Sequence, residues 1–318
     1  MSNPFDFLAP LVSLDEKIHE LEQLSLSSGV AVAPEVESLR VKLGEESRKL
    51  FAVLTPWQRV QLSRHPLRPQ SSDYVDHMLD DFVPLAGDRR FADDEAIITG
   101  IGKLGDIAVM IVGQQKGKDV HERRRCNFGM PHPEGYRKAM AKMRIAEKFG
   151  LPIICLVNTP GAFPGVEAEE RGQSIAIAEN IRDMALIRVP IIVVVIGEGG
   201  SGGALGIGVG DRILMLQNSY FSVISPEGCA AILWKDSAKK DLAAERLKLT
   251  GPELMKFGIV DEIIEEPAGG AHRQPLVTTE ALKTVLLKHL GQLQALTTDE
   301  LLEKRYQKYR AIGEVRES

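Results

Sequence analysis

Glycines are concentrated in one segment of this sequence, directly after an unbroken run of Ile and Val. The run Pro190 to Ile196 leads into Gly197-Glu-Gly-Gly-Ser-Gly-Gly-Ala204 and then into a stretch of small residues. Glycine has no Cβ, so successive backbone amides in such a turn can point at one acceptor. The N-terminus of a following helix adds partial positive charge, which suits an anion or a developing oxyanion. The pattern therefore predicts a backbone site for negative charge.

The same segment matches the spacing of the dinucleotide-binding fingerprint. Gly197-x-Gly199-x-x-Gly202 lies between a predicted strand and a predicted helix, as that motif requires. The motif also needs an acidic residue at the end of the next strand, about twenty residues on. The sequence there is Leu216-Gln-Asn-Ser-Tyr220, which contains no carboxylate. The dinucleotide interpretation is therefore weak.

Ser201 offers another interpretation, because Gly199-x-Ser201-x-Gly203 has the spacing of the nucleophile elbow in serine hydrolases. Asp261 and His272 follow it in the order in which many of those enzymes place the acid and the histidine. Glycines on both sides of Ser201 favour donation by the backbone over an exposed, strained side chain, and His272 lies in a Gly-rich stretch that is more typical of a loop. A serine hydrolase that uses Ser201, and a turn that is only tightly packed, remain the alternatives.

A second glycine-containing loop, Asn158-Thr-Pro-Gly-Ala-Phe-Pro-Gly165, follows the apolar run Pro152 to Val157. If the two apolar runs are neighbouring parallel strands, both loops lie at the edge of the sheet where α/β folds bind ligands. Gly161 and Gly165 lie on either side of Phe163 and are expected to offer free amides near an apolar ring. The carboxylates that follow are interpreted as helix starters and not as general bases.

Apolar and amphipathic runs alternate from about Asp94 onward, which predicts an α/β fold with buried, mainly parallel strands. The expected strands are 96–101 and 107–112, which form a hairpin, and then 152–157, 190–196, 213–217 and 259–264. The expected helices are 134–149, 169–187, a short one after Ser201, one opened by a Thr250 capping box, 278–293 and 298–312. Gly150 and Gly258 are expected helix ends.

Residues 1–90 are expected to form a helical hairpin and a linker. Ser13-Leu-Asp-Glu16 has the pattern of a capping box that opens the first helix. A second amphipathic stretch follows, with Gly44 interrupting it. Pro56, Pro66 and Pro69 are expected to break helical structure in the linker. The hairpin fits a cap on its own domain and a docking arm for another subunit equally well.

The composition is that of an ordinary folded protein, since 44% of its 318 residues are hydrophobic and 26% are charged. A net charge of -5 gives no general attraction to nucleic acid or acidic membranes, so we expect no specific nucleic-acid site. Cys126, Cys155 and Cys229 lack CxxC spacing, which argues against a zinc ribbon and favours a reducing compartment. The sequence has no evident signal peptide or membrane-spanning run, and we expect a cytoplasmic location.

Several longer motifs together resemble one family. They are Asn158 to Gln173, Gly197 to Leu205 and Val223-Ile-Ser-Pro-Glu-Gly-Cys-Ala230, supported by Asn127 to Pro131, Pro133 to Lys138, Arg305-Tyr-Gln-Lys308 and the Leu54-Thr-Pro-Trp-Gln58 linker. This combination closely resembles the carboxyltransferase alpha subunit of the bacterial, multi-subunit acetyl-CoA carboxylase. The likeness covers nearly the whole chain and has no departure within the glycine loops.

The resemblance implies a crotonase fold, a ClpP/crotonase-like spiral of ββα units, over residues 91–318, with an N-terminal helical extension and C-terminal helices. It implies an α2β2 heterotetramer whose active site is shared between alpha and beta subunits. The beta partner of that family holds acetyl-CoA and a zinc ribbon, so no metal is expected in this chain. The biotin carboxyl carrier protein and biotin carboxylase are the further partners that the resemblance implies.

The resemblance also implies the reaction, which is transfer of a carboxyl group from carboxybiotin to acetyl-CoA to give malonyl-CoA, the first committed step of fatty acid biosynthesis. Gly202 and Gly203 would donate their amides to the ureido oxygen of biotin, which becomes negative when CO2 leaves. Gly161 and Ala162 would form the opposing wall. The other expected carboxybiotin-binding residues are Phe163, Gly165, Gly199 and Gly200. No side-chain base is required, because the biotin enolate can take the α-proton of acetyl-CoA.

A run of three arginines is the remaining candidate for binding. Arg123, Arg124 and Arg125 could meet the phosphates of CoA or the acidic face of a carrier domain. Most such runs are solvated, so a solvated surface is the alternative interpretation of this run.

Overall fold

The computed structural model describes residues 4–28 and 32–313, and an eight-stranded sheet forms its centre. The strand order is β1-β2-β3-β4-β5-β6-β8, and β7 pairs with the end of β5. The strands are β1 (Asp80–Pro84), β2 (Ile97–Leu104), β3 (Ile107–Gln114), β4 (Ile153–Thr159), β5 (Ile191–Gly200), β6 (Arg212–Leu216), β7 (Tyr220–Ser222) and β8 (Glu262–Ile264). The predicted α/β class is confirmed.

The strands pair as expected, with one antiparallel hairpin beside mainly parallel strands. β2 and β3 form the predicted antiparallel hairpin, whereas β3, β4, β5, β6 and β8 pair in parallel. β4 and β5 are direct neighbours, and Thr159 is the register partner of Gly199. Both glycine loops therefore leave the sheet at the same edge, as predicted.

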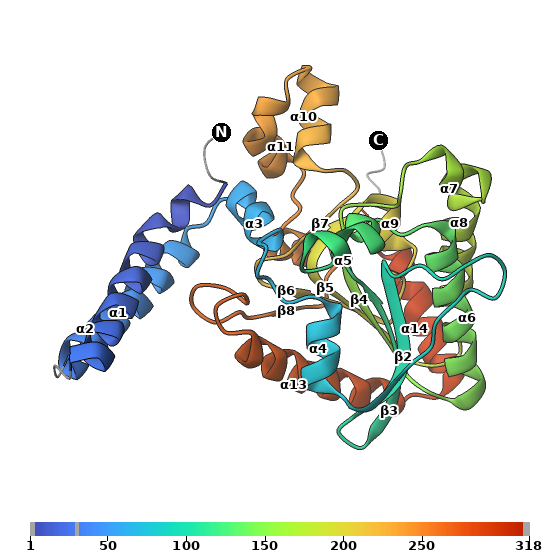
Figure 1. Cartoon of the computed structure of the whole chain (residues 1–318). Coiled ribbons are helices and arrows are strands. Elements are labelled where there is room, and N and C mark those ends of the chain that lie inside the picture. Colours follow the sequence, from blue (N-terminus) through green and yellow to red (C-terminus); the bar gives the residue numbers. More distant parts are fainter. Residues whose placement is uncertain (1–3, 29–31, 314–318) are drawn as a thin grey trace.

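Helices cover both faces of the sheet, because alternate residues of each buried strand point to opposite sides. Ile153 and Cys155 of β4 pack in one core with α6 (Pro133–Phe149), α8 (Gln173–Met184) and α14 (Thr298–Arg310). Ile154 and Leu156 pack in a second core with α4 (Ser71–Met78) and α13 (Pro275–Gln294). Figure 1 shows the sheet between these two sets of helices.

The N-terminal helices form the predicted hairpin, which projects from the body of the molecule (Figure 1). It consists of α1 (Ala9–Ser28) and α2 (Ala33–Ala52). The prediction that Ser13 opens the first helix is wrong, because α1 begins at Ala9. Gly44 does not interrupt α2, since packing against α1 outweighs the roughly 1 kcal/mol that one helical glycine costs.

The linker contains helices that the three prolines had been expected to exclude. Pro56 is the first residue of α3 (Pro56–Ser63), a position that needs no backbone N–H, and Thr55 caps this helix by accepting a hydrogen bond from the Gln58 amide. α4 and β1 then pack on the sheet, so parts of the predicted linker belong to its core. The division into residues 1–90 and 91–318 stays a prediction.

The other helices are α5 (Val120–Arg125), α7 (Val166–Glu170), α9 (Ser201–Leu205), α10 (Pro226–Trp234), α11 (Lys240–Arg246) and α12 (Gly251–Lys256). The helix expected over 169–187 is divided, because Gly172 takes a left-handed conformation with φ 84° between α7 and α8. Thr250 precedes α12 without making the predicted side-chain cap. In the described part of the chain, no helix has both the length and the apolar character needed to cross a membrane.

Candidate functional site

The two glycine loops touch through their backbones. A Cβ on Gly203 would lie 2.4 Å from the amide nitrogen of Ala162 and 2.4 Å from the carbonyl carbon of Gly161. A Cβ on Gly200 would lie 2.3 Å from the carbonyl oxygen of Pro160. Only glycine permits such an approach at these two positions. The structure thus brings Gly203 of one predicted loop against Gly161 and Ala162 of the other.

Gly202 and Gly203 occupy the second and third positions of α9. The first N–H groups of a helix have no acceptor within it, so helix geometry leaves both amides available. Their surroundings differ, however. Gly203 is buried, whereas Gly202 is half-buried and a Cβ there would find no atom nearer than Ile177 Cγ2 at 3.9 Å.

The prediction of free amides in the 158–165 loop is wrong at Gly161. Its amide donates to Thr159 Oγ1 at 3.0 Å, because the threonine side chain folds back over the turn. The amide of Phe163 is also used, donating to the Pro131 carbonyl at 3.0 Å. The Phe163 ring stacks on His132 with centroids 4.2 Å apart, and Gly165 packs against the edge of that ring. This loop therefore supplies a wall and not a set of donors at these positions.

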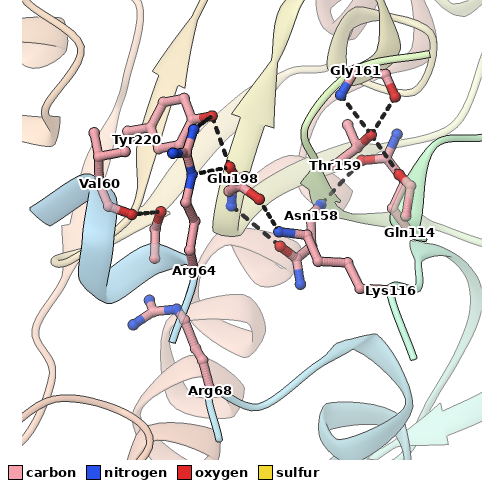
Figure 2. A network of polar contacts seen from close by, with 12 residues as sticks. Val60, Arg64, Arg68, Gln114, Lys116, Asn158, Thr159, Gly161, Glu198 and Tyr220 are labelled. Atoms are coloured by element: carbon pink, nitrogen blue, oxygen red, sulfur yellow. Dashed lines mark hydrogen bonds and ion pairs between the residues drawn. The ribbon is translucent and has the colours of Figure 1, made fainter. Parts of the chain in front are cut away.

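Gln114, at the end of β3, holds the two loops together, and Figure 2 shows its contact with Asn158. Its Oε1 accepts from the Asn158 amide at 3.0 Å, and its Nε2 donates to the Gly203 carbonyl at 2.8 Å. The Tyr136 hydroxyl donates to the same carbonyl at 3.1 Å. Sequence reasoning missed Gln114. The available signal was a glutamine at the end of an apolar strand, where a buried amide must find partners.

Glu198 forms a buried ionic cluster beside the loops (Figure 2). Arg64 donates to its Oε1 at 2.6 Å, Lys116 pairs with its Oε2, and the Tyr220 hydroxyl donates at 3.0 Å. Burial alone would raise the pKa of Glu198, but Lys116 and Arg64 outweigh burial and lower it to about 2. The amide of Glu198 also donates to Asn158 Oδ1 at 3.2 Å, which connects this cluster to the carboxyl end of β4. The sequence alone did not indicate this cluster.

Of the three residues that the hydrolase alternative requires, only Ser201 is arranged as that mechanism needs. Ser201 is exposed with φ 54°, a strained conformation of the kind that a nucleophile elbow uses. His272, however, stacks on His65 with centroids 3.9 Å apart, and burial lowers its pKa to about 3. Asp261 accepts from the Ile213 amide and pairs with Lys308. Within residues 4–28 and 32–313, these three side chains do not form a triad.

The three predicted arginines have separate surroundings. Arg123 lines a polar cavity and donates from Nε to the Gly117 carbonyl at 3.3 Å. Arg124 is exposed, and Arg125 forms an exposed ion pair with Glu95 at 3.1 Å. Only Arg123 faces the edge of the sheet where the loops lie. No cluster of three or more His, Cys, Asp or Glu side chains suited to a metal ion occurs in the part that the structure describes.

The chain has the crotonase-type fold of solved carboxyltransferases. The chain superposes on a transcarboxylase 12S chain solved with methylmalonyl-coenzyme A bound (TM-score 0.54, 21% identity, 66% of this chain and 41% of that one). It also superposes on a chain of a Pseudomonas malonate decarboxylase hetero-tetramer in complex with coenzyme A (TM-score 0.55, 16% identity, 68% and 86%). At these identities the likeness concerns the fold.

Sequence comparison gives the family. The chain belongs to the acetyl-coenzyme A carboxylase carboxyltransferase-like family, whose model matches residues 4–313. It is 52% identical over 311 residues to the acetyl-coenzyme A carboxylase carboxyl transferase subunit alpha of Stenotrophomonas maltophilia, covering 98% of both chains. It is 52% identical over 314 residues to the corresponding subunit of Halalkalibacterium halodurans, covering 99% of this chain and 97% of that one.

Proposed function

We propose that this chain is the alpha half of an acetyl-CoA carboxylase carboxyltransferase and that it supplies the oxyanion site for carboxybiotin. The observation that carries the proposal is the backbone contact of Gly203 with Gly161 and Ala162 at the carboxyl ends of β4 and β5. That contact fixes the first turn of α9 against a rigid wall. Preorganised donors of this kind stabilise developing charge without having to reorganise during the reaction.

The amides of Gly202 and Gly203 donate to the ureido oxygen of carboxybiotin, which becomes negative as CO2 departs. The α-proton of acetyl-CoA passes to biotin, and the carbon that lost it attacks CO2 to give malonyl-CoA. Gly161, Ala162, Phe163, Gly165, Gly199 and Gly200 bound the biotin pocket. No side chain of this chain has to act as a base, so the contribution of the protein is position and charge stabilisation.

An apolar cavity of about 330 Å3 beside Gly202 supports a site shared with a partner. Leu205, Val223 and Phe257 line it and are 42%, 77% and 52% exposed in the isolated chain. Such exposure of large apolar side chains is typical of an interaction surface. The proposed partner is a beta subunit that holds acetyl-CoA and a zinc ribbon, in an α2β2 heterotetramer. The biotin carboxyl carrier protein and biotin carboxylase complete the proposed assembly, in the cytoplasm.

The reverse reaction tests the proposal directly. The chain is mixed with its beta subunit, malonyl-CoA and free biotin, and formation of acetyl-CoA is followed. Activity should require both subunits. A serine hydrolase would instead act without the beta subunit and lose its activity on Ser201→Ala. Ester hydrolysis by the isolated chain that disappears in this variant would contradict the carboxyltransferase proposal.

A further inference from the structure

A polar cavity of about 250 Å3 lies beside the glycine loops. Asn158 and Glu198, near the carboxyl ends of β4 and β5, form part of its lining. The remaining lining comes from the end of α3 and the turn after it, from the loop between β3 and α5, and from α5 and the short helix that follows, so segments far apart in the sequence close around it. Parallel α/β sheets bind their ligands at this edge. The position of the cavity is therefore that of a binding site.

Positive charge dominates the lining. The charged side chains that line the cavity are four cations and one carboxylate: Arg64, Arg68, Lys116, Arg123 and Glu198. Arg68 is already neutralised, because its guanidinium forms a fully buried pair with Glu266 and donates to the Ile196 carbonyl. The other three cations face one lining carboxylate, and Glu227 pairs with Arg64 from outside the lining, which leaves an excess of one positive charge beside the cavity.

Arg64 and Lys116 share that carboxylate, Glu198 (Figure 2). Glu227 meets Arg64 as well, at 2.5 Å, but it does not line the cavity and its side chain is 37% exposed. Burial, together with the neighbouring guanidinium groups, lowers the pKa of Lys116 even though Glu198 is beside it. A further anion would therefore stabilise the charged form of this lysine.

Arg123 brings donors that the protein does not use. Its Nε donates to the Gly117 carbonyl at 3.3 Å, and its terminal nitrogens have no hydrogen-bond or ion-pair partner among the described residues. Arg and Lys form short, charge-assisted hydrogen bonds with phosphate oxygens, and a phosphate group carries a charge near -2 at neutral pH. The excess charge and the free donors both match that group.

The size of the cavity limits the ligand further. It is smaller than the roughly 300–1,000 Å3 of pockets that hold drug-sized ligands, so a whole nucleotide does not fit within it. We propose that the cavity between Arg64, Lys116 and Arg123 is a binding site for a phosphate-class anion. The anion is either inorganic phosphate or the phosphate-bearing end of a larger molecule.

Calorimetric titration of the chain in complex with its beta subunit, with inorganic pyrophosphate as probe, tests the site. Lys116→Gln and Arg123→Gln should each weaken binding about tenfold or more, the effect of losing one charge-assisted hydrogen bond. Lys118→Gln is the matched control. It removes the same charge from the same loop, but Lys118 pairs with Asp73 and does not line the cavity. This control should bind the probe as the unmodified chain does.

Equal weakening in all three variants would overturn the proposal, because general electrostatics would then explain the binding. Absence of binding to the unmodified complex at millimolar probe would overturn it too. Because Lys116 pairs with the buried Glu198, melting temperatures accompany the titrations, and Arg123, which forms no ion pair among the described residues, provides the variant that keeps its fold.

Adenosine 3′,5′-bisphosphate separates the two sources of the anion. If adenosine 3′,5′-bisphosphate competes with acetyl-CoA in the unmodified complex but not in Arg123→Gln, the site binds the phosphates of CoA. If adenosine 3′,5′-bisphosphate displaces pyrophosphate but does not compete with acetyl-CoA, the site binds free phosphate. The titrations involve no carboxyl transfer, so their outcome does not depend on the oxyanion proposal.

Discussion

Gly203 is the residue on which the proposed oxyanion site depends most. A valine there would place its Cβ about where the backbone of Gly161 and Ala162 now lies, and neither neighbour is a flexible side chain that could move aside. We expect Gly203→Val to separate the loops and to reduce kcat about 100–1000-fold, the usual cost of losing one oxyanion donor. Gel filtration should still show the complex with the beta subunit. Unchanged turnover would remove the glycine loop from the mechanism.

Gly202→Ala is the control for Gly203→Val, because it adds a side chain to the same turn without entering the backbone of the other loop. A Cβ at Gly202 enters open space, with its nearest neighbour 3.9 Å away. The amide is retained, so we expect a much smaller loss of kcat than in Gly203→Val, measured in the same reverse assay. A loss as large as that of Gly203→Val would show that this open space is itself filled by the substrate.

Gln114 is expected to act on turnover through the loops that it connects. Gln114→Leu removes one of the two donors to the Gly203 carbonyl and the acceptor of the Asn158 amide, which leaves this buried amide unpaired at a cost of about 1–3 kcal/mol. We expect kcat to fall while KM for acetyl-CoA changes little. Tyr136→Phe removes only one of the two donors to the Gly203 carbonyl and should have a smaller effect. An increase in KM with unchanged kcat would argue against this positioning role.

At the scale of elements, one arginine anchors the last helix to the body. Arg305 of α14 is 1% exposed; it forms two hydrogen bonds with Asp211 and donates to three backbone carbonyls, those of Met184, Ile187 and Val189. This geometry explains why an arginine stands in the Arg305-Tyr-Gln-Lys308 motif. A lysine cannot reproduce the planar fork of donors.

Arg305→Lys should therefore lower the free energy of unfolding by about 3 kcal/mol, because it leaves a buried carboxylate poorly paired. Urea denaturation measures the change. Lys304→Gln, at the exposed neighbouring position of the same helix, should stay within about 0.5 kcal/mol of the unmodified chain. Similar values for both variants would mean that α14 is not anchored through Arg305.

The elements differ in how far their local sequence determines them. The core strands and α6 could be predicted because a continuous apolar run and a capped amphipathic helix each carry their own signal, and Gly150 ends α6 in the left-handed conformation as expected. β1 and α4 could not, since an exposed five-residue strand becomes regular only by pairing with β2, and a short helix preceded by prolines only by packing on the sheet. The contact of the two loops was predictable in position but not in detail, because the side chain of Thr159 and the distant Gln114 decide which amides are used.

At the scale of the whole molecule, two ion pairs with buried carboxylates connect the N-terminal segment to the body. Arg64 reaches Glu198 of β5, and Arg68 reaches Glu266, which follows β8. Both arginines lie between α3 and α4, in the region that had been expected to be only a linker. Neither pair has a signature in the sequence, because each joins residues more than one hundred positions apart. The segment is therefore part of the folded core near the site.

These ion pairs should make the free energy of unfolding depend on pH in the acid range. Burial would raise the pKa values of Glu198 and Glu266, but the paired cations lower both to about 2, from an ordinary value of 4.5. A carboxylate with a lowered pKa stabilises the fold fully above its unfolded value and loses that contribution as the pH falls through its folded value. Each pair is expected to contribute roughly 3 kcal/mol, which disappears between about pH 4.5 and pH 2.

Urea denaturation as a function of pH checks this expectation. The free energy of unfolding should fall steeply below pH 4.5 in the unmodified chain. Glu266→Gln should be less stable at neutral pH and should show a shallower fall, since one of the two paired, buried carboxylates is gone. Glu303→Gln, which replaces an exposed glutamate of α14, should reproduce the unmodified profile. If Glu266→Gln lost stability with acid as steeply as the unmodified chain, the Arg68 to Glu266 pair would not be what connects the N-terminal segment to the sheet.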